Sequence, residues 1–90
     1  MSDPLPVRVM VLDTWDEIRL TVPASTPVSE LKRTALVRSR VRRPPELYEV
    51  KFRGAVLPEN GGAGGRTLAD LGVPPNAALI VLSRRRIPVR

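Results

Sequence analysis

The sequence VKFRGAVL, residues 50–57, decides the fold of this chain. With the residues before it, this stretch predicts a strand from Tyr48 to Arg53, in which apolar and charged side chains alternate as on a sheet with one buried face. Gly54 then permits a tight turn into a second, short apolar strand, which Pro58 ends. The segment therefore predicts a strand, a glycine turn and another strand.

A single helical turn is predicted further along, where residues 65–71 are GRTLADL. The Thr67 side chain can cap this turn, and the Asp70 carboxylate can bond back to the start of it. Gly72 can end the turn, because glycine adopts a left-handed backbone conformation without steric cost. We expect two leucines, Leu68 and Leu71, to anchor the turn in the core.

The first part of the chain predicts a β-hairpin. Residues 7–12 place three valines at alternate positions, residues 17–22 alternate apolar and polar side chains, and a short link of polar or turn-prone residues joins them. Two such runs form strands with one buried side. The last strand is predicted at residues 78–83. The side chains expected to face the core are Val7, Val9 and Val11 on the first strand, Ile18, Leu20 and Val22 on the second, and Leu79 and Val81 on the last.

A helix is predicted between the hairpin and the third strand. Ser25 and Thr26 precede Pro27, and a hydroxyl N-cap followed by proline at the first helical position favours a helix start. Pro44 and Pro45 are expected to end the element. The helical period turns Val28, Leu31, Ala35 and Leu36 inward and leaves Glu30, Lys32 and Arg33 pointing away. Four arginines follow, where cations complement the helix dipole: Arg38, Arg40, Arg42 and Arg43.

The predicted order is strand, strand, helix, strand, short strand, helical turn, strand. A hairpin followed by a crossover helix places the helix across one face of the sheet. The right-handed crossover rule then makes the first and last strands parallel neighbours at the centre of the sheet. The sequence thus predicts an α+β fold, with a mixed sheet of four to five strands and one helix packed across it.

This order and several local sequences resemble ubiquitin and the ubiquitin-like proteins. The most specific similarity lies in residues 50–57 and 65–71, which look like the family's strand–Gly turn–strand and its Gly-Arg-Thr-Leu-x-Asp segment. PVSELK at residues 27–32 is similar to the start of the family helix. The resemblance implies a ubiquitin-like β-grasp, and within the family a bacterial ubiquitin-like protein without a C-terminal Gly-Gly.

On this basis the chain divides into three parts. Residues 1–6 form an N-terminal extension and residues 7–84 the ubiquitin-like domain. Within the domain, residues 59–66 form a flexible, glycine-rich loop. The basic C-terminal tail, residues 85–90, consists of Arg85, Arg86, Ile87, Pro88, Val89 and Arg90.

The tail bears on the choice between covalent and non-covalent function. Family members that become covalently attached end in Gly-Gly, because the activating enzyme needs an unhindered terminal carboxylate. The matching positions here are Ile87 and Pro88, and the chain stops at Arg90. A β-branched residue and a proline fit that role poorly, so the sequence favours non-covalent binding.

The resemblance also implies a partner-binding face, made by outward positions of the third and fifth strands and by the first hairpin turn. The residues at these positions and beside them are Trp15, Lys51, Arg53, Ile80, Leu82 and Arg84. Ile80 and Leu82 alternate with core residues and should be exposed, and Trp15 offers a large rigid surface. Lys51 stands where ubiquitin has an aliphatic residue, so we expect a basic patch that standard ubiquitin receptors bind poorly. Two other interpretations stay open: Ile80 and Leu82 could pack under the tail or a neighbouring copy, and Trp15 could cover its own sheet.

Composition narrows the function classes further. The 90 residues contain no cysteine and no histidine, which removes thiolate chemistry, the usual general base and the commonest metal ligand. We therefore expect no enzyme activity, no catalytic or metal-binding residues and no cofactor. No apolar run is long enough to cross a membrane, so we expect a cytoplasmic protein without membrane insertion. The net charge of +6 predicts attraction to acidic partners.

Three functions remain open. The preferred one is a protein-interaction module, a monomer or weak oligomer whose partners carry acidic surfaces, such as a secretion or assembly complex or operon-encoded conjugation-like enzymes. The second is a covalent modifier in a bacterial conjugation-like pathway that uses an atypical C-terminus. The third is a basic nucleic-acid-associated domain, which is disfavoured because one Phe, one Tyr and one Trp do not make a stacking platform.

Overall fold

The computed structural model describes residues 4–59 and 66–83. The described elements, in chain order, are β1 (Pro4–Val11), β2 (Asp16–Pro23), α1 (Val28–Arg38), the 3₁₀ helix η1 (Pro45–Leu47), β3 (Tyr48–Phe52), β4 (Ala55–Val56) and β5 (Ala77–Ser83). The predicted elements are all present. The first strand begins earlier than predicted, at Pro4 instead of Val7.

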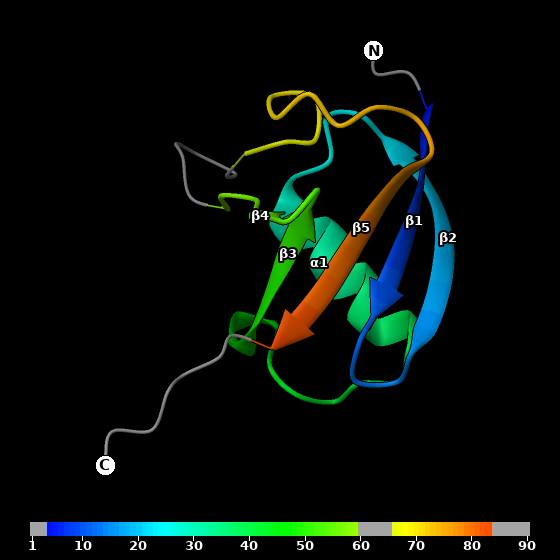
Figure 1. Ribbon diagram of the computed structural model, residues 1–90, viewed down its shortest axis with the longest axis vertical. Coiled ribbons are helices and arrows are strands. Elements are labelled where there is room, and N and C mark those ends of the chain that lie inside the picture. The colour runs from blue at the N-terminus through cyan, green and yellow to red at the C-terminus, as the bar shows by residue number, and fades with distance from the viewer. Residues whose placement is uncertain (1–3, 60–65, 84–90) are drawn as a thin grey trace.

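One five-stranded sheet holds these elements in the order β2-β1-β5-β3-β4. β1 pairs with β5 in parallel, and the other neighbours are antiparallel. α1 lies diagonally across one face of the sheet, and Figure 1 shows it behind the strands. The α+β class and the parallel pairing of the first and last strands are thus confirmed.

The core lies between α1 and the sheet face that the helix covers. The predicted valines of β1, the leucine and valine of β5 and the four predicted helix residues are all buried. On the edge strand β2 only Leu20 is fully buried, whereas Ile18 and Val22 are partly exposed. An edge strand projects past the helix, so its inward side chains keep some contact with water.

The glycine turn predicted between β3 and β4 is confirmed. Arg53 and Gly54 have φ values of 56° and 81°. Positive φ at both central residues is the backbone of a two-residue hairpin turn that matches the twist of its strands. Glycine reaches this conformation freely, so the turn that decides the fold is set by Gly54.

The start of α1 differs from the prediction. Pro27 occupies the N-cap position itself, and no side chain caps the helix. Instead, the Val28 amide donates to the Arg66 carbonyl at 2.8 Å, and the Leu68 amide donates to the Thr26 carbonyl at 3.0 Å. A distant backbone segment therefore satisfies the orphan amide that a hydroxyl was expected to satisfy.

The end of α1 also differs, because the helix stops at Arg38, well before the two prolines. The Val41 amide donates to the Leu36 carbonyl and the Arg40 amide to the Val37 carbonyl, which is the Schellman pattern. Arg40 takes the left-handed position with φ of 62°. The prolines instead introduce η1, with Pro45 as its first residue.

The turn at residues 67–72 is confirmed in detail. The Thr67 amide donates to Asp70 Oδ2 at 3.2 Å, and the Asp70 amide donates to Thr67 Oγ1 at 3.1 Å. This reciprocal pair is the predicted capping box. Gly72 has φ of 69°, and Leu68 is fully buried while Leu71 is partly buried.

One helix residue predicted to face solvent is buried. Lys32 is only 3% exposed. Its Nζ lies 2.7 Å from Glu59 Oε1 and donates to the Tyr48 carbonyl at 3.0 Å. The prediction for Lys32 was wrong because the structure supplies a counter-charge and a backbone acceptor beneath the helix.

Candidate protein-docking surface

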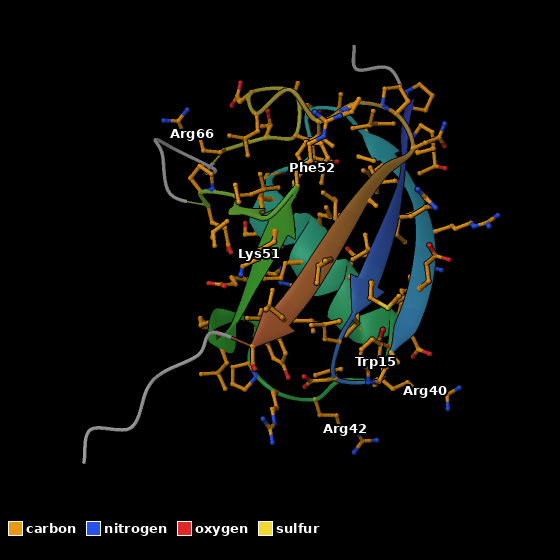
Figure 2. The ribbon with its side chains drawn as sticks, in the orientation of Figure 1. Trp15, Arg40, Arg42, Lys51, Phe52 and Arg66 are labelled. Carbon is orange, nitrogen blue, oxygen red and sulfur yellow. The ribbon has the colours of Figure 1, made fainter. Side chains whose placement is uncertain are left out.

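The sheet face opposite α1 carries a row of side chains that crosses all five strands. Met10 of β1 pairs with Glu17 of β2 and with Ile80 of β5. Ile80 pairs with Lys51 of β3, which pairs with Val56 of β4. Cross-strand partners share one face of a sheet, so three apolar side chains and Lys51 lie together. We call Met10, Ile80, Lys51 and Val56 the central row; Figure 2 views this face.

The central row is accessible to water within the described part of the chain. Val56 is 48% exposed and Ile80 38% exposed, while Met10 and Lys51 are half-buried. Ile80 alternates along β5 with Leu79 and Val81, which are 1% and 0% exposed. The predicted outward position of Ile80 is therefore what the structure shows.

A shallow depression lies beside the central row, toward the end of the sheet that carries the β1–β2 turn. Leu82 is half-buried and faces Glu49 of β3. Leu12, Asp13, Lys51 and Ser83 complete the rim of a hollow of about 370 Å³. The hollow mixes apolar and charged side chains, so it offers both contact area and polar anchoring points.

Trp15 projects from the β1–β2 turn. Trp15 is 76% exposed, so its side chain does not pack over its own sheet. Its φ of 56° is a left-handed conformation that costs a non-glycine residue roughly 1–2 kcal/mol. A large aromatic residue that is exposed and has a strained backbone contributes little to stability. This combination favours a role for Trp15 in binding.

The remaining predicted site residues fall into two groups. Arg53 lies in the β3–β4 turn, with its guanidinium carbon 5.0 Å from the centre of the Phe52 ring. Figure 2 places Phe52 at the opposite end of the sheet from Trp15. Arg84 and the predicted tail residues 85–90 lie outside the described residues. Of the predicted set, the structure brings together Lys51, Ile80 and Leu82.

A polar cluster holds the Trp15 turn against the start of β3. The hydroxyl of Tyr48, a fully buried residue, donates to Asp13 Oδ2. Burial raises the pKa of Tyr48, and the hydrogen bond to Asp13 and its negative charge raise it further, while Arg43 acts in the opposite direction. The turn, the loop that carries Arg43 and β3 thus meet at one hydroxyl.

The raised pKa of Tyr48 predicts a stability loss in alkali. A tyrosine whose pKa is higher in the folded state than in the unfolded chain contributes stability fully below about pH 10, and this contribution disappears as the pH rises through the folded-state pKa. Tyr48→Phe should cost about 1.5–3 kcal/mol at about pH 8, since a hydrogen bond to a carboxylate is lost. Urea unfolding should show the gap between the two proteins shrinking by about pH 11. A gap that stays constant would contradict this role of the hydroxyl.

Comparison with known proteins points to one fold. No protein-family model matches the chain, and no curated protein sequence matches it. Among solved structures, the ubiquitin of Caldiarchaeum subterraneum superposes with a TM-score of 0.74 at 15% identity, covering 93% of this chain and 98% of that one. A structure described as molecular mimicry of SUMO that promotes DNA repair gives 0.75 at 14% identity, with 90% and 92% covered. A ubiquitin-like domain from Arabidopsis thaliana gives 0.70 at 16% identity, with 97% and 84% covered.

The fold is a ubiquitin-like β-grasp. The TM-scores of 0.70–0.75 establish the fold, and at 14–16% identity the function has to be argued from the side chains of this chain. The fold implied by the sequence resemblance is therefore confirmed. The bacterial origin and the missing Gly-Gly remain predictions.

Sequence analysis of this β-grasp missed two members of the central row. Met10 lies between two inward valines, so strand alternation alone places it outward. Val56 belongs to a strand of two residues, too short to show a period. Its facing is known only from its pairing with Lys51.

The β-grasp offers no metal centre in residues 4–59 and 66–83, where no cluster of three or more candidate ligands occurs. No helix in these ranges is long and apolar enough to cross a membrane. The chemistry that the described surface presents is apolar contact flanked by charge.

Proposed function

We propose that the chain is a non-catalytic ubiquitin-like module that binds other proteins without forming a covalent bond. The observation that carries this proposal is the central row. α1 covers one face of the sheet, and the other face presents Met10, Ile80 and Val56 around the ammonium of Lys51. Apolar side chains clustered on a face that no described element covers are typical of a binding surface.

The charges on this face are mixed, and the net charge of the chain favours an acidic partner. Arg8 and Arg19 stand opposite each other on β1 and β2, and Lys51 lies in the central row. Two carboxylates, Glu17 and Glu49, share the face, and Glu17 lies 3.8 Å from Arg8. Against this mixed local pattern, the net charge of +6 attracts acidic proteins at long range.

The area of the sheet face limits the binding affinity that this face can provide alone. The five strands hold eight, eight, five, two and seven residues in the order of the chain. With strands about 4.8 Å apart and about six residues long on average, the face measures roughly 19 by 20 Å. That area is about half of the roughly 800 Å² that each partner buries in a standard stable interface. The sheet face alone therefore supports weak, reversible binding, and tighter binding requires neighbouring elements such as the Trp15 turn.

Affinity capture from a lysate of the source organism tests the proposal. The variant Ile80→Asp/Leu82→Asp places two carboxylates on the outer face of the sheet. It should abolish capture of partners, because each carboxylate would have to lose its water when an apolar surface of the partner covers it. The matched control is Val37→Asp/Leu47→Asp, which makes the same chemical change at residues that are 68% and 50% exposed and lie off the sheet. Circular dichroism of both variants, which should match that of the wild type, checks that they remain folded.

Three outcomes separate the possibilities. A partner lost with Ile80→Asp/Leu82→Asp, kept with the control and released by denaturant supports non-covalent docking through the sheet. Equal loss with both variants would refute the sheet as the docking site. Heavier species that survive denaturation would show a covalent modifier and overturn the proposal.

A further inference from the structure

The end of the domain that carries Trp15 also carries a concentration of arginines. Arg40 and Arg42 lie in the loop after α1, and Figure 2 places them at the same end as Trp15, with Arg66 at the opposite end. Arg38 and Arg43 belong to the same stretch of chain. We call Trp15 with Arg38, Arg40, Arg42 and Arg43 the Trp15 end.

Internal contacts hold the two halves of the Trp15 end together. Asp13, in the same turn as Trp15, accepts the hydrogen bond from Tyr48, and Tyr48 in turn interacts with Arg43. Backbone bonds from Arg40 and Val41 fix the loop to the last turn of α1 at 3.0 and 2.9 Å. The exposed indole and the arginines are therefore presented by elements tied to one another, so little ordering is required on binding.

The helix dipole does not account for so many cations. The C-terminus of a helix carries about half a negative charge, and its effect fades beyond the last turn. Within residues 4–59 and 66–83, no ion pair involves Arg38, Arg40 or Arg42. Two carboxylates face the arginines, Asp13 in the β1–β2 turn and Asp16 at the start of β2, and Glu46 of η1 follows Arg43 by three residues. The Tyr48 hydroxyl that donates to Asp13 is neutral and leaves the charge of Asp13 in place, so four arginines stand against three carboxylates. The Trp15 end keeps an excess of positive charge.

We infer that the Trp15 end is a second docking surface, which takes an acidic segment of a partner protein. Guanidinium groups bind carboxylates with paired hydrogen bonds. An apolar side chain of the segment packs against the indole of Trp15, which is 76% exposed. The inference rests on the proposed function as a protein-binding module and adds a surface outside the central row.

The aromatic residues favour a peptide over a nucleic acid. Single-stranded nucleic acid is held by several aromatic side chains on which successive bases stack. Here Tyr48 is fully buried and Arg53 lies over the ring of Phe52. That leaves Trp15 as one exposed stacking surface in the described chain, enough for one apolar side chain and too little for a run of bases.

Binding of a synthetic peptide tests this inference directly. The probe is a fluorescein-labelled ten-residue peptide of Asp and Glu with two central leucines, followed by anisotropy at about 50 mM salt. Arg40→Glu/Arg42→Glu should raise its Kd by about tenfold or more, and wild-type affinity should fall steeply as salt is added. Arg33→Glu/Arg66→Glu is the matched control, with the same change in net charge at two exposed sites, one in the middle of α1 and one at the opposite end from Trp15, and should raise Kd by less than about threefold.

Further variants separate this surface from the sheet. Trp15→Ser should weaken the peptide about tenfold at high salt as well, because the indole contact is apolar. Ile80→Asp/Leu82→Asp should weaken it no more than the control pair does. Equal weakening by both arginine pairs, or tighter binding of a single-stranded DNA oligonucleotide than of the peptide, would overturn the inference. The proposed function would still stand if the sheet variant abolished partner capture while the peptide failed to bind.

Discussion

Glu59→Leu is expected to lower the free energy of unfolding by about 3–5 kcal/mol, because it leaves a buried ammonium without its counter-charge. Lys32 Nζ lies 2.7 Å from Glu59 Oε1, and the two side chains are 4% and 14% exposed. The second bond of Lys32, to the Tyr48 carbonyl at 3.0 Å, remains in the variant. A carbonyl dipole cannot replace a full negative charge, so the ammonium stays poorly solvated. Urea unfolding at about pH 7 measures the loss.

Two further variants show whether burial causes the effect. Lys32→Met/Glu59→Leu removes both charges and should recover most of the lost stability, since apolar side chains often replace a buried pair without cost. Glu17→Leu breaks the pair between Arg8 and Glu17, whose side chains are about half exposed at 48% and 45%. This surface pair should contribute less than about 1 kcal/mol. A similar loss for Glu17→Leu and Glu59→Leu would show that burial does not increase the contribution of the ion pair to the free energy of unfolding.

The buried pair joins three parts of the fold. Lys32 belongs to α1, the carbonyl it contacts belongs to the first residue of β3, and Glu59 follows β4. A domain of this size has a total stability of about 5–15 kcal/mol. Loss of this one contact would therefore remove a large part of the margin that keeps α1 docked behind the sheet that carries the central row.

Local patterns predicted most of this fold correctly. Alternation on β1 and β5 identified the inward side chains, because a strand with one buried face has a strict period of two. Gly54 and Gly72 identified two turns, since both positions require a positive φ. The capping box of Thr67 and Asp70 depends on residues three apart, so the sequence contains everything needed to predict it.

The errors arose where distant segments act. Lys32 lies four residues after Val28 and three before Ala35, on the buried stripe of α1, but its charge suggested solvent. Its partners, Tyr48 and Glu59, are brought to it only by the fold. The helix start likewise depends on Arg66, which lies far along the chain. Helical spacing alone, without regard to residue type, places Lys32 on the buried side of α1.

The candidate docking surface was only partly predictable for the same reason. The outward positions of Ile80 and Leu82 follow from alternation along one strand. The central row, however, requires the register of five strands, and no local pattern states that Lys51 lies opposite both Ile80 and Val56. The arginines after α1 were noted in the sequence, but their position at the same end as Trp15 follows from the path of the loop.

Leu68→Ala is expected to lower the free energy of unfolding by about 2–5 kcal/mol, since it opens a cavity that the surrounding structure cannot fill. Leu68 is fully buried, its amide bonds to the Thr26 carbonyl at 3.0 Å, and its own carbonyl accepts the Val73 amide at 3.1 Å. Backbone held on both sides cannot move inward, so the cavity persists. The control Leu71→Ala removes the same atoms from a partly buried site in the same turn and should cost about half as much or less. Thermal unfolding of the two variants gives the comparison, and equal losses would mean that the turn is anchored by its hydrogen bonds instead of by Leu68.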